Sequence, residues 1–218
     1  MKKNNLADLA ALIIWLLPLI YFMNIYQTLP VSVPTHFGID GKPDRYSSKQ
    51  ELIWIVLFLS VITLAVYFLI RYLPKIDPKK TAGYSAEIFK KISFGLIIFL
   101  SGIQFFVINS SATGSFALDK MFFPFIGLFF AYLGNLLHSI KPNYFIGIRT
   151  PWTLEDPDTW RATHQLSGKL WFFGGILITI TTLFLPAKIG FVFFLTIIII
   201  ISLVPVIYSF IYFKKHKK

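Results

Sequence analysis

The chain has 218 residues, of which 56% are hydrophobic, 24 are Phe and only 14% are charged. These proportions lie far from the averages of soluble domains and indicate an integral membrane protein. The net charge of +11 is typical of a topology signal with attraction to anionic membrane lipids, so no direct nucleic-acid binding is expected. The absence of cysteine excludes disulfides and thiol chemistry.

Six apolar runs predict an all-α, polytopic protein with six transmembrane helices. The runs cover roughly residues 7–26, 51–73, 88–108, 119–140, 170–186 and 189–213. At about 1.5 Å per residue, each is long enough, or nearly so, to cross a hydrocarbon core of about 30 Å. The fifth run is the shortest, and Pro186 with Lys188 forms a tight link to the sixth, so these two helices should form a hairpin.

The loop at residues 27–50, between the first two runs, is predicted to be structured. Pro30 and Pro34 favour extended backbone, whereas the Asp40-Gly41 and Pro43-Asp44 pairs favour turns. A capping-box sequence, Ser48 followed by Glu51, should start the second helix.

The same loop contains three side chains that could in principle bind a metal ion, because imidazole and carboxylate ligands suit zinc or manganese. They are His36, Asp40 and Asp44. Their spacing matches no recognised metal site, and basic residues lie among them. We therefore expect hydrogen bonds or ion pairs that hold the shape of the loop, with no metal and no other cofactor.

Ionisable residues are missing from the middle of the apolar runs, where transporters and proton pumps keep them for function. Asp8 and Glu87 lie near the predicted starts of helices. The strongest polar groups within or beside the third and fourth runs are the amides of Gln104, Asn109 and Asn135. Such amides are more often contacts between helices than parts of a substrate path.

The loop at residues 141–169 is polar, aromatic and rich in turns, which is typical of a segment that recognises a partner or caps two helix ends. Asp156 is a good N-cap and Pro157 suits a first helical position, so a helix should begin at Pro157. One face of this helix should carry Trp160, Thr163, His164, Ser167 and Trp171, which follow one another at spacings of three and four.

The polar residues of this loop have structural interpretations beside the functional ones. Arg149 offers a planar fork of donors for helix ends or an acidic partner. Trp152 and Trp160 suit either anchoring at the lipid headgroups or recognition. His164 has no nearby nucleophile or carboxylate pair, so a hydrogen-bonded structural role is favoured over catalysis. No phosphate loop, metalloprotease helix or nucleophile elbow is present, and the protein is not expected to be an enzyme.

The distribution of basic residues predicts the orientation, because Lys and Arg near helix ends resist transfer across the membrane. With six crossings, 16 of the 21 Lys and Arg residues fall on the side of the two termini. The other five are Lys42, Arg45, Lys49, Lys120 and Lys188. Both termini and the 141–169 loop are therefore expected in the cytoplasm, and the 27–50 loop outside the cell.

Two sets of motif residues resemble known bacterial membrane domains. In the outer loop, Pro34, His36, Gly41, Pro43, Asp44 and Lys49 resemble the DUF1648 domain, although Gly38 stands where members often carry a polar residue. The inner loop is similar to the signature of the SdpI family of immunity proteins. The residues that carry this second resemblance are Asn143, Gly147, Arg149, Thr150, Pro151, Trp152, Thr153, Trp160, Thr163, His164 and Gly168.

The resemblance implies a division into residues 1–75, a DUF1648-like pair of helices, and residues 76–218, an SdpI-like membrane region. It also implies a function: protection of the host bacterium, in its cell membrane, against a secreted hydrophobic peptide toxin on the outer side. Members also capture a small repressor on the cytoplasmic side. Two alternatives stay open, which are a membrane enzyme or metal-dependent hydrolase that uses the outer His and Asp residues, and a transporter of small molecules or peptides.

Overall fold

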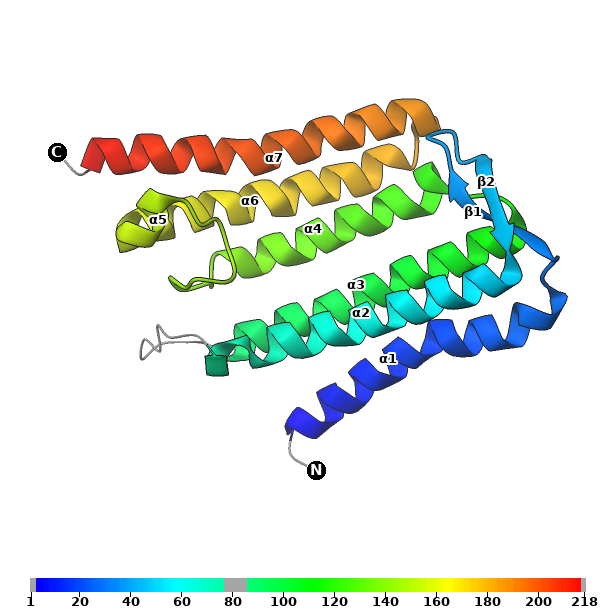
Figure 1. Cartoon of the computed structure of the whole chain (residues 1–218). Coiled ribbons are helices and arrows are strands. Elements are labelled where there is room, and N and C mark those ends of the chain that lie inside the picture. The colour runs from blue at the N-terminus through cyan, green and yellow to red at the C-terminus, as the bar shows by residue number, and fades with distance from the viewer. Residues whose placement is uncertain (1–2, 77–85, 217–218) are drawn as a thin grey trace.

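The computed structural model describes residues 3–76 and 86–216, and the chain within these ranges is dominated by six long helices (Figure 1). Their bounds are α1 Lys3–Ile25, α2 Lys49–Ile76, α3 Ala86–Thr113, α4 Phe123–Leu137, α6 Pro157–Thr182 and α7 Ala187–His216. Each predicted apolar run has most of its residues in one of these helices, and α4 is preceded by a π-helical turn at Leu118–Phe122.

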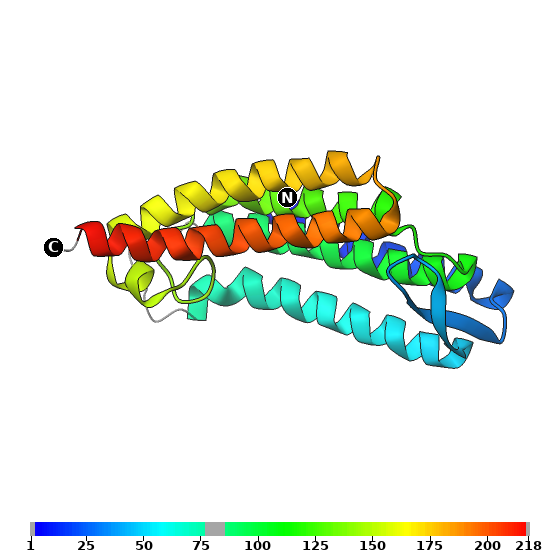
Figure 2. The same cartoon turned by 90° about the horizontal axis from the view of Figure 1, so that it is seen from above.

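Five of these helices are long and apolar enough to cross a membrane, namely α1, α2, α3, α4 with its preceding turn, and α7. The sixth, α6, runs beside α4 and α7 (Figure 2). Its first half is polar and carries the last residues of the inner motif, whereas its second half contains most of the predicted fifth apolar run. The chain is thus a multi-pass membrane protein, and the crossing of α6 remains a prediction.

The two motif loops lie at opposite ends of the bundle (Figure 1). A two-stranded hairpin, β1 Ser32–Phe37 and β2 Pro43–Ser48, marks what we call the hairpin end. The short helix α5, Pro151–Glu155, and the last residues of α7 lie on the opposite side, which we call the terminal end. The predicted hairpin of the last two helices is present, since α6 ends at Thr182 and α7 begins at Ala187.

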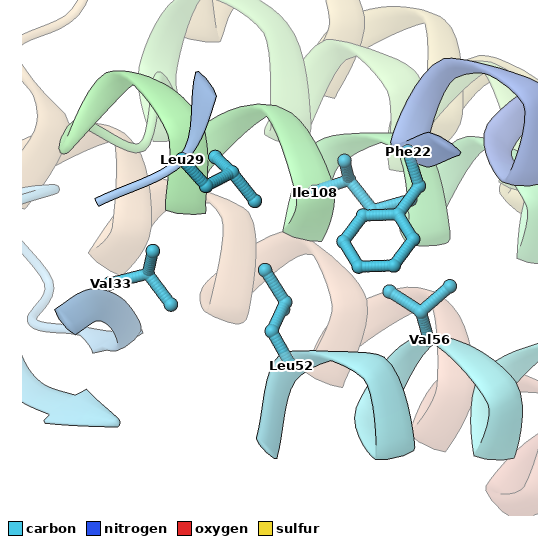
Figure 3. Packing of buried hydrophobic residues seen from close by; sticks show 6 residues of the cluster. All are labelled: Phe22, Leu29, Val33, Leu52, Val56 and Ile108. Atoms are coloured by element: carbon cyan, nitrogen blue, oxygen red, sulfur yellow. The ribbon is translucent and has the colours of Figure 1, made fainter. Parts of the chain in front are cut away.

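A hydrophobic cluster joins the hairpin to the first three helices (Figure 3). Val33 of β1 and Leu52 of α2 are fully buried, and they pack with side chains from α1 and α3. The other members are Phe22, Leu29, Val56 and Ile108. The cluster therefore fixes the hairpin to the helices rather than leaving it as a free loop.

The predicted role of amides in helix contacts is confirmed for two of the three. Gln104 is fully buried in α3, and its Nε2 donates to Ser60 Oγ at 2.8 Å and to the Val56 carbonyl at 3.2 Å on α2. Asn109 accepts a hydrogen bond from the Tyr21 hydroxyl of α1 at 3.1 Å. Asn135, in contrast, is exposed.

Close backbone contact holds α4 against α6. A Cβ added at Gly175 would lie 2.4 Å from the Gly127 carbonyl oxygen, and one at Gly134 would lie 2.3 Å from the Phe172 nitrogen. Small residues allow such approach between helices in a membrane, where packing rather than water exclusion drives association. These two helices form one closely packed pair, and the loop that carries the inner motif connects them.

The packing of α3 differs from the division at residue 75, which assigns this helix to the C-terminal region. Ile97 of α3 packs with Ala11 of α1 and Tyr67 of α2, and Ile108 belongs to the cluster of Figure 3. In space, α3 packs with α1 and α2.

The expectation of an all-α chain also missed the hairpin, whose strands contain Pro34 and a run of polar residues.

Candidate functional site: two motif loops at opposite ends

The outer motif forms an antiparallel hairpin with a tight, docked tip. Gly41 has φ +76°, a conformation that L side chains rarely adopt. Its carbonyl accepts a hydrogen bond from the Phe116 amide at 3.1 Å, and Phe37 packs on the Phe116 ring with centroids 5.6 Å apart. The hairpin tip is therefore tied to the connection between α3 and α4, which sequence analysis did not foresee.

The acidic and imidazole groups of the hairpin stabilise its shape. His36 Nδ1 lies 2.5 Å from Asp44 Oδ1 across the strands, and both side chains are exposed. Asp40 instead accepts the Lys42 amide at 3.2 Å, as in an Asx turn. The three residues named as conceivable metal ligands do not converge, and the described ranges contain no cluster of three or more His, Cys, Asp or Glu side chains.

The base of the hairpin joins the helices on either side of it. Pro34 is buried. Lys49, the first residue of α2, donates to the Leu29 carbonyl at 3.4 Å and lies 5.1 Å from the centre of the Tyr26 ring. The Ser48 hydroxyl accepts the Glu51 amide at 3.2 Å, which confirms the predicted cap of α2. Pro43 begins β2.

The inner motif starts with Asn143, whose side chain organises the turn after α4. The residue is 1% exposed. Its Oδ1 accepts the amides of Phe145 and Ile146 at 2.8 and 2.7 Å, while its Nδ2 donates to the carbonyls of Lys141 and Ile146, both at 2.9 Å. Both donor positions and both acceptor positions of this buried amide are satisfied, so Asn143 is a structural centre of the loop.

Gly147 and His164 hold the loop onto α6. Gly147 has φ +112°, and a Cβ there would lie 2.3 Å from His164 Nε2, so only glycine fits. The next amide, that of Ile148, donates to Nε2 at 3.0 Å, and Nδ1 lies 2.8 Å from the Trp160 carbonyl. Because a carbonyl can only accept, Nδ1 carries the proton and the ring is neutral. Burial lowers the pKa of His164, in agreement with a neutral ring.

Trp160 completes the same buried unit. It is 2% exposed, its ring stacks on His164 with centroids 4.1 Å apart, and its Nε1 donates to the Ile140 carbonyl at 2.7 Å. Thr163 and Ser167 on the same face are fully buried, and Gly168 packs on Gly134. The face expected to be both aromatic and polar exists, but it points into the protein.

A second local unit, α5, lies between the loop and α6. Thr150 is its N-cap, Pro151 is its first residue, and Thr150 and Thr153 form a reciprocal capping box. The Thr153 hydroxyl also donates to the Ile148 carbonyl at 2.9 Å. The predicted start of α6 is confirmed, because Asp156 caps it by accepting the Thr159 amide at 2.8 Å before Pro157.

Trp152 attaches α5 to the last helix. Its Nε1 donates to the Ser209 hydroxyl, and its ring lies 5.2 Å from that of Phe210. Ser209 carries no signal in the sequence, since it lies 57 residues away in an apolar run. Neither motif tryptophan anchors the protein in lipid headgroups through a free indole N–H.

Few side chains of the inner motif remain accessible. Arg149 is exposed. Its guanidinium donates to the Tyr144 carbonyl, which holds the side chain against the loop. Tyr144 and Phe145 beside it are also exposed. Any partner at the terminal end would therefore meet these residues, while Trp160, Thr163 and His164 support them from within.

Taken together, six long helices with an ordered hairpin at one end and a hydrogen-bonded loop at the other define a polytopic membrane protein with two structured faces. Residues 13–61 match the model of DUF1648, a domain of unknown function, and residues 139–209 match that of the SdpI/YfhL protein family. The DUF1648 match therefore precedes the SdpI/YfhL match along the chain, and the two matches include the hairpin and the inner loop, respectively.

Two relatives extend this finding. The chain is 26% identical to a protein named Immunity protein SdpI of Bacillus subtilis (strain 168), over 99% of this chain and 98% of the relative. It is 42% identical over 53 residues to an uncharacterized protein of Archaeoglobus fulgidus, which covers 24% of this chain and 27% of that protein. No solved structure matches the chain.

Proposed function

We propose that the protein confers immunity on a bacterial cell against a secreted hydrophobic peptide toxin. The observation that carries the proposal is the similarity to Immunity protein SdpI across 99% of this chain. A match of this extent includes both motif loops and all six helices. An immunity protein of the cell membrane also suits the toxin class, because a hydrophobic peptide acts where the protein resides.

The hairpin is the proposed contact for the toxin. It presents apolar side chains to its surroundings at Val31, Ile39 and Tyr46, which are 77%, 50% and 59% exposed. Exposed apolar groups on a rigid support are typical of a surface that binds another apolar molecule. The predicted orientation would place this surface outside the cell, where a secreted toxin arrives.

The exposed part of the inner loop is the proposed docking site for a small repressor. Arg149, Tyr144 and Phe145 combine one cation with two aromatic rings, which are common anchors of protein interfaces. Toxin binding would change capture of the repressor only if toxin prefers one of two conformations of the protein, since equal affinity shifts no equilibrium.

The enzyme and transporter alternatives have no specific observation in their favour. Both ring nitrogens of His164 are engaged by the backbone, and His36 faces Asp44 in the hairpin. Asp8 pairs with Arg71 at 2.6 Å, near the start of α1 and the end of α2. This ion pair therefore does not lie midway along a helix, where a transporter keeps its ionisable groups.

The test expresses the protein in a toxin-sensitive bacterium together with a fluorescently tagged repressor from the same gene neighbourhood. Wild type should raise survival and draw the repressor to the membrane. The paired variants Ile39→Ser and Tyr46→Ser should lower survival, whereas Arg149→Ala should abolish recruitment and leave survival nearly unchanged, at equal expression.

Each outcome bears on one part of the proposal. If wild type gives no survival benefit against any related toxin, the immunity proposal is wrong. If Arg149→Ala always loses survival and recruitment together, the inner loop is structural and the docking site lies elsewhere.

A further inference from the structure

A groove along α3 runs from the terminal end toward the middle of the bundle, bordered first by α1, α2 and α4 and then by α4 alone. The part nearer the terminal end, which we call the upper part, has a volume of about 380 Å³ and is lined largely by charged and polar side chains. The part nearer the middle of the bundle, the lower part, has a volume of about 340 Å³ and is lined mainly by apolar side chains. Phe94 and Tyr132 line both parts, so the two parts adjoin at these residues. The Tyr132 hydroxyl donates to the Lys91 carbonyl at 2.6 Å, and this bond fixes the ring at the boundary.

The upper part carries an excess of positive charge. Three cations line it, Arg71, Lys90 and Lys91, beside one acid, Glu87. Arg71 is paired with Asp8 at 2.6 Å and Lys90 with Glu87 at 3.2 Å. Lys91 is exposed and has no acidic partner within the described ranges, so one positive charge is left for a ligand.

The lower part opens sideways, toward the hydrocarbon that surrounds a membrane protein. Its lining consists of Phe94, Ile98, Phe99, Phe125, Leu128 and Phe129, together with Gly95 and Tyr132. Ile98 is 40% and Leu128 is 53% exposed, so the groove has no wall on that side. A Cβ at Gly95 would lie 2.2 Å from the Tyr132 ring, so this glycine lets the ring pack closely against α3.

We propose that this groove binds one anionic phospholipid from the leaflet at the terminal end, independently of the immunity function. The phosphate of its headgroup would lie by Lys91, and an acyl chain would fill the lower part. Basic side chains at the membrane surface attract anionic lipid. An unfolded peptide fits the lower part poorly, because its backbone N–H and C=O groups would find no partners there.

The proposal is tested by native mass spectrometry of the purified full-length protein, titrated with phosphatidylglycerol or with phosphatidylcholine of identical acyl chains. Wild type should retain one phosphatidylglycerol in preference to phosphatidylcholine. Lys91→Gln, which keeps the carbonyl used by Tyr132, should weaken phosphatidylglycerol about fivefold, equivalent to about 1 kcal/mol for one basic residue near the surface. Ile98→Trp, which narrows the lower part, should weaken both lipids.

The matched control is Lys169→Gln, because Lys169 is an exposed lysine on α6 that lines a different hollow. It should leave retention unchanged, and an equal loss would show that general surface charge, not the groove, selects the lipid. Equal retention of the two lipids by wild type would overturn the proposal. So would binding of inorganic phosphate alone with the same affinity, or a second protein copy held in the groove in place of lipid.

Discussion

At the scale of single residues, the inner motif is composed mainly of side chains that satisfy backbone groups. Asn143, His164 and Trp160 are buried, and each bonds to the main chain of a different part of the loop or its flanking helices. Left unpaired, each buried polar group would cost about 1–3 kcal/mol. The residues of the inner motif therefore serve mainly to build the loop, and few of them are left exposed.

His164 should make the stability of the protein depend on pH. Burial lowers its pKa below the ordinary value of about 6.5, so below pH 6.5 the unfolded chain takes up a proton that the folded chain refuses. The stabilising contribution is complete above that pH and is lost as the pH falls toward the folded-state pKa. Thermal unfolding of purified protein between pH 7.5 and 5 should show a falling midpoint for wild type.

The substitution His164→Gln removes the titrating group and should flatten this dependence while it lowers the midpoint at pH 7.5. His138→Gln is the control, since His138 is exposed and its side chain takes no part in the hydrogen bonds of the loop described above. If His164→Gln keeps the full pH dependence of wild type, another group causes it.

At the scale of elements, sequence patterns predicted the features that depend on residues near one another in the chain. Apolar runs gave the six helices, and Asp156 with Pro157 gave the start of α6, because caps act within a few residues. The hairpin was missed because its second strand reads PDRYSS, which lacks the alternation of a half-buried strand. Contacts such as that of Trp152 with Ser209 depend on how α7 packs, which no local pattern contains.

The pairing of α4 with α6 should be sensitive to one methyl group. Gly175→Ala would place a Cβ 2.4 Å from the Gly127 carbonyl oxygen and 2.5 Å from the Ala131 nitrogen, so the helices must separate. Overpacking of this kind costs about 1–3 kcal/mol. We expect a clearly lower unfolding midpoint and less monodisperse protein on size-exclusion chromatography.

Gly190→Ala is the matched control for that experiment. Gly190 is a buried glycine of α7, but the nearest atom to its added Cβ is 3.8 Å away, an ordinary contact. This variant should behave like wild type. Equal damage from both substitutions would mean that helix glycines act through the unfolded state or membrane insertion, not through the α4–α6 contact.

At the scale of the whole molecule, the two motif loops lie at opposite ends of the bundle and are predicted to face opposite sides of the membrane (Figure 1). The predicted orientation assigns 16 basic residues to the terminal end and 5 to the hairpin end. Lys2, Lys79, Lys80, Lys217 and Lys218 lie outside the described residues. The separation means that toxin contact and repressor capture, as proposed, use surfaces that never meet.

The orientation is open to direct measurement because the chain has no cysteine of its own. In intact cells, Lys42→Cys in the exposed hairpin turn should react with a membrane-impermeant thiol reagent, and Glu155→Cys at the exposed end of α5 should react only after the cells are opened. Labelling of Glu155→Cys from outside would reverse the assignment and move the proposed toxin contact to the inner side.

The hydrogen bonds around the inner loop also imply an order of assembly. The Trp160 indole and the Ile140 carbonyl are 20 residues apart, so α4 and α6 can close on each other at a small entropic cost as soon as both have been synthesised. Trp152 meets Ser209 57 residues later, so α5 gains its second support only when α7 arrives. We therefore expect a nascent chain that ends before Ser209 to contain a packed α4–α6 pair in which α5 still lacks its contact with α7. The arrival of α7 would then complete the folding of the loop.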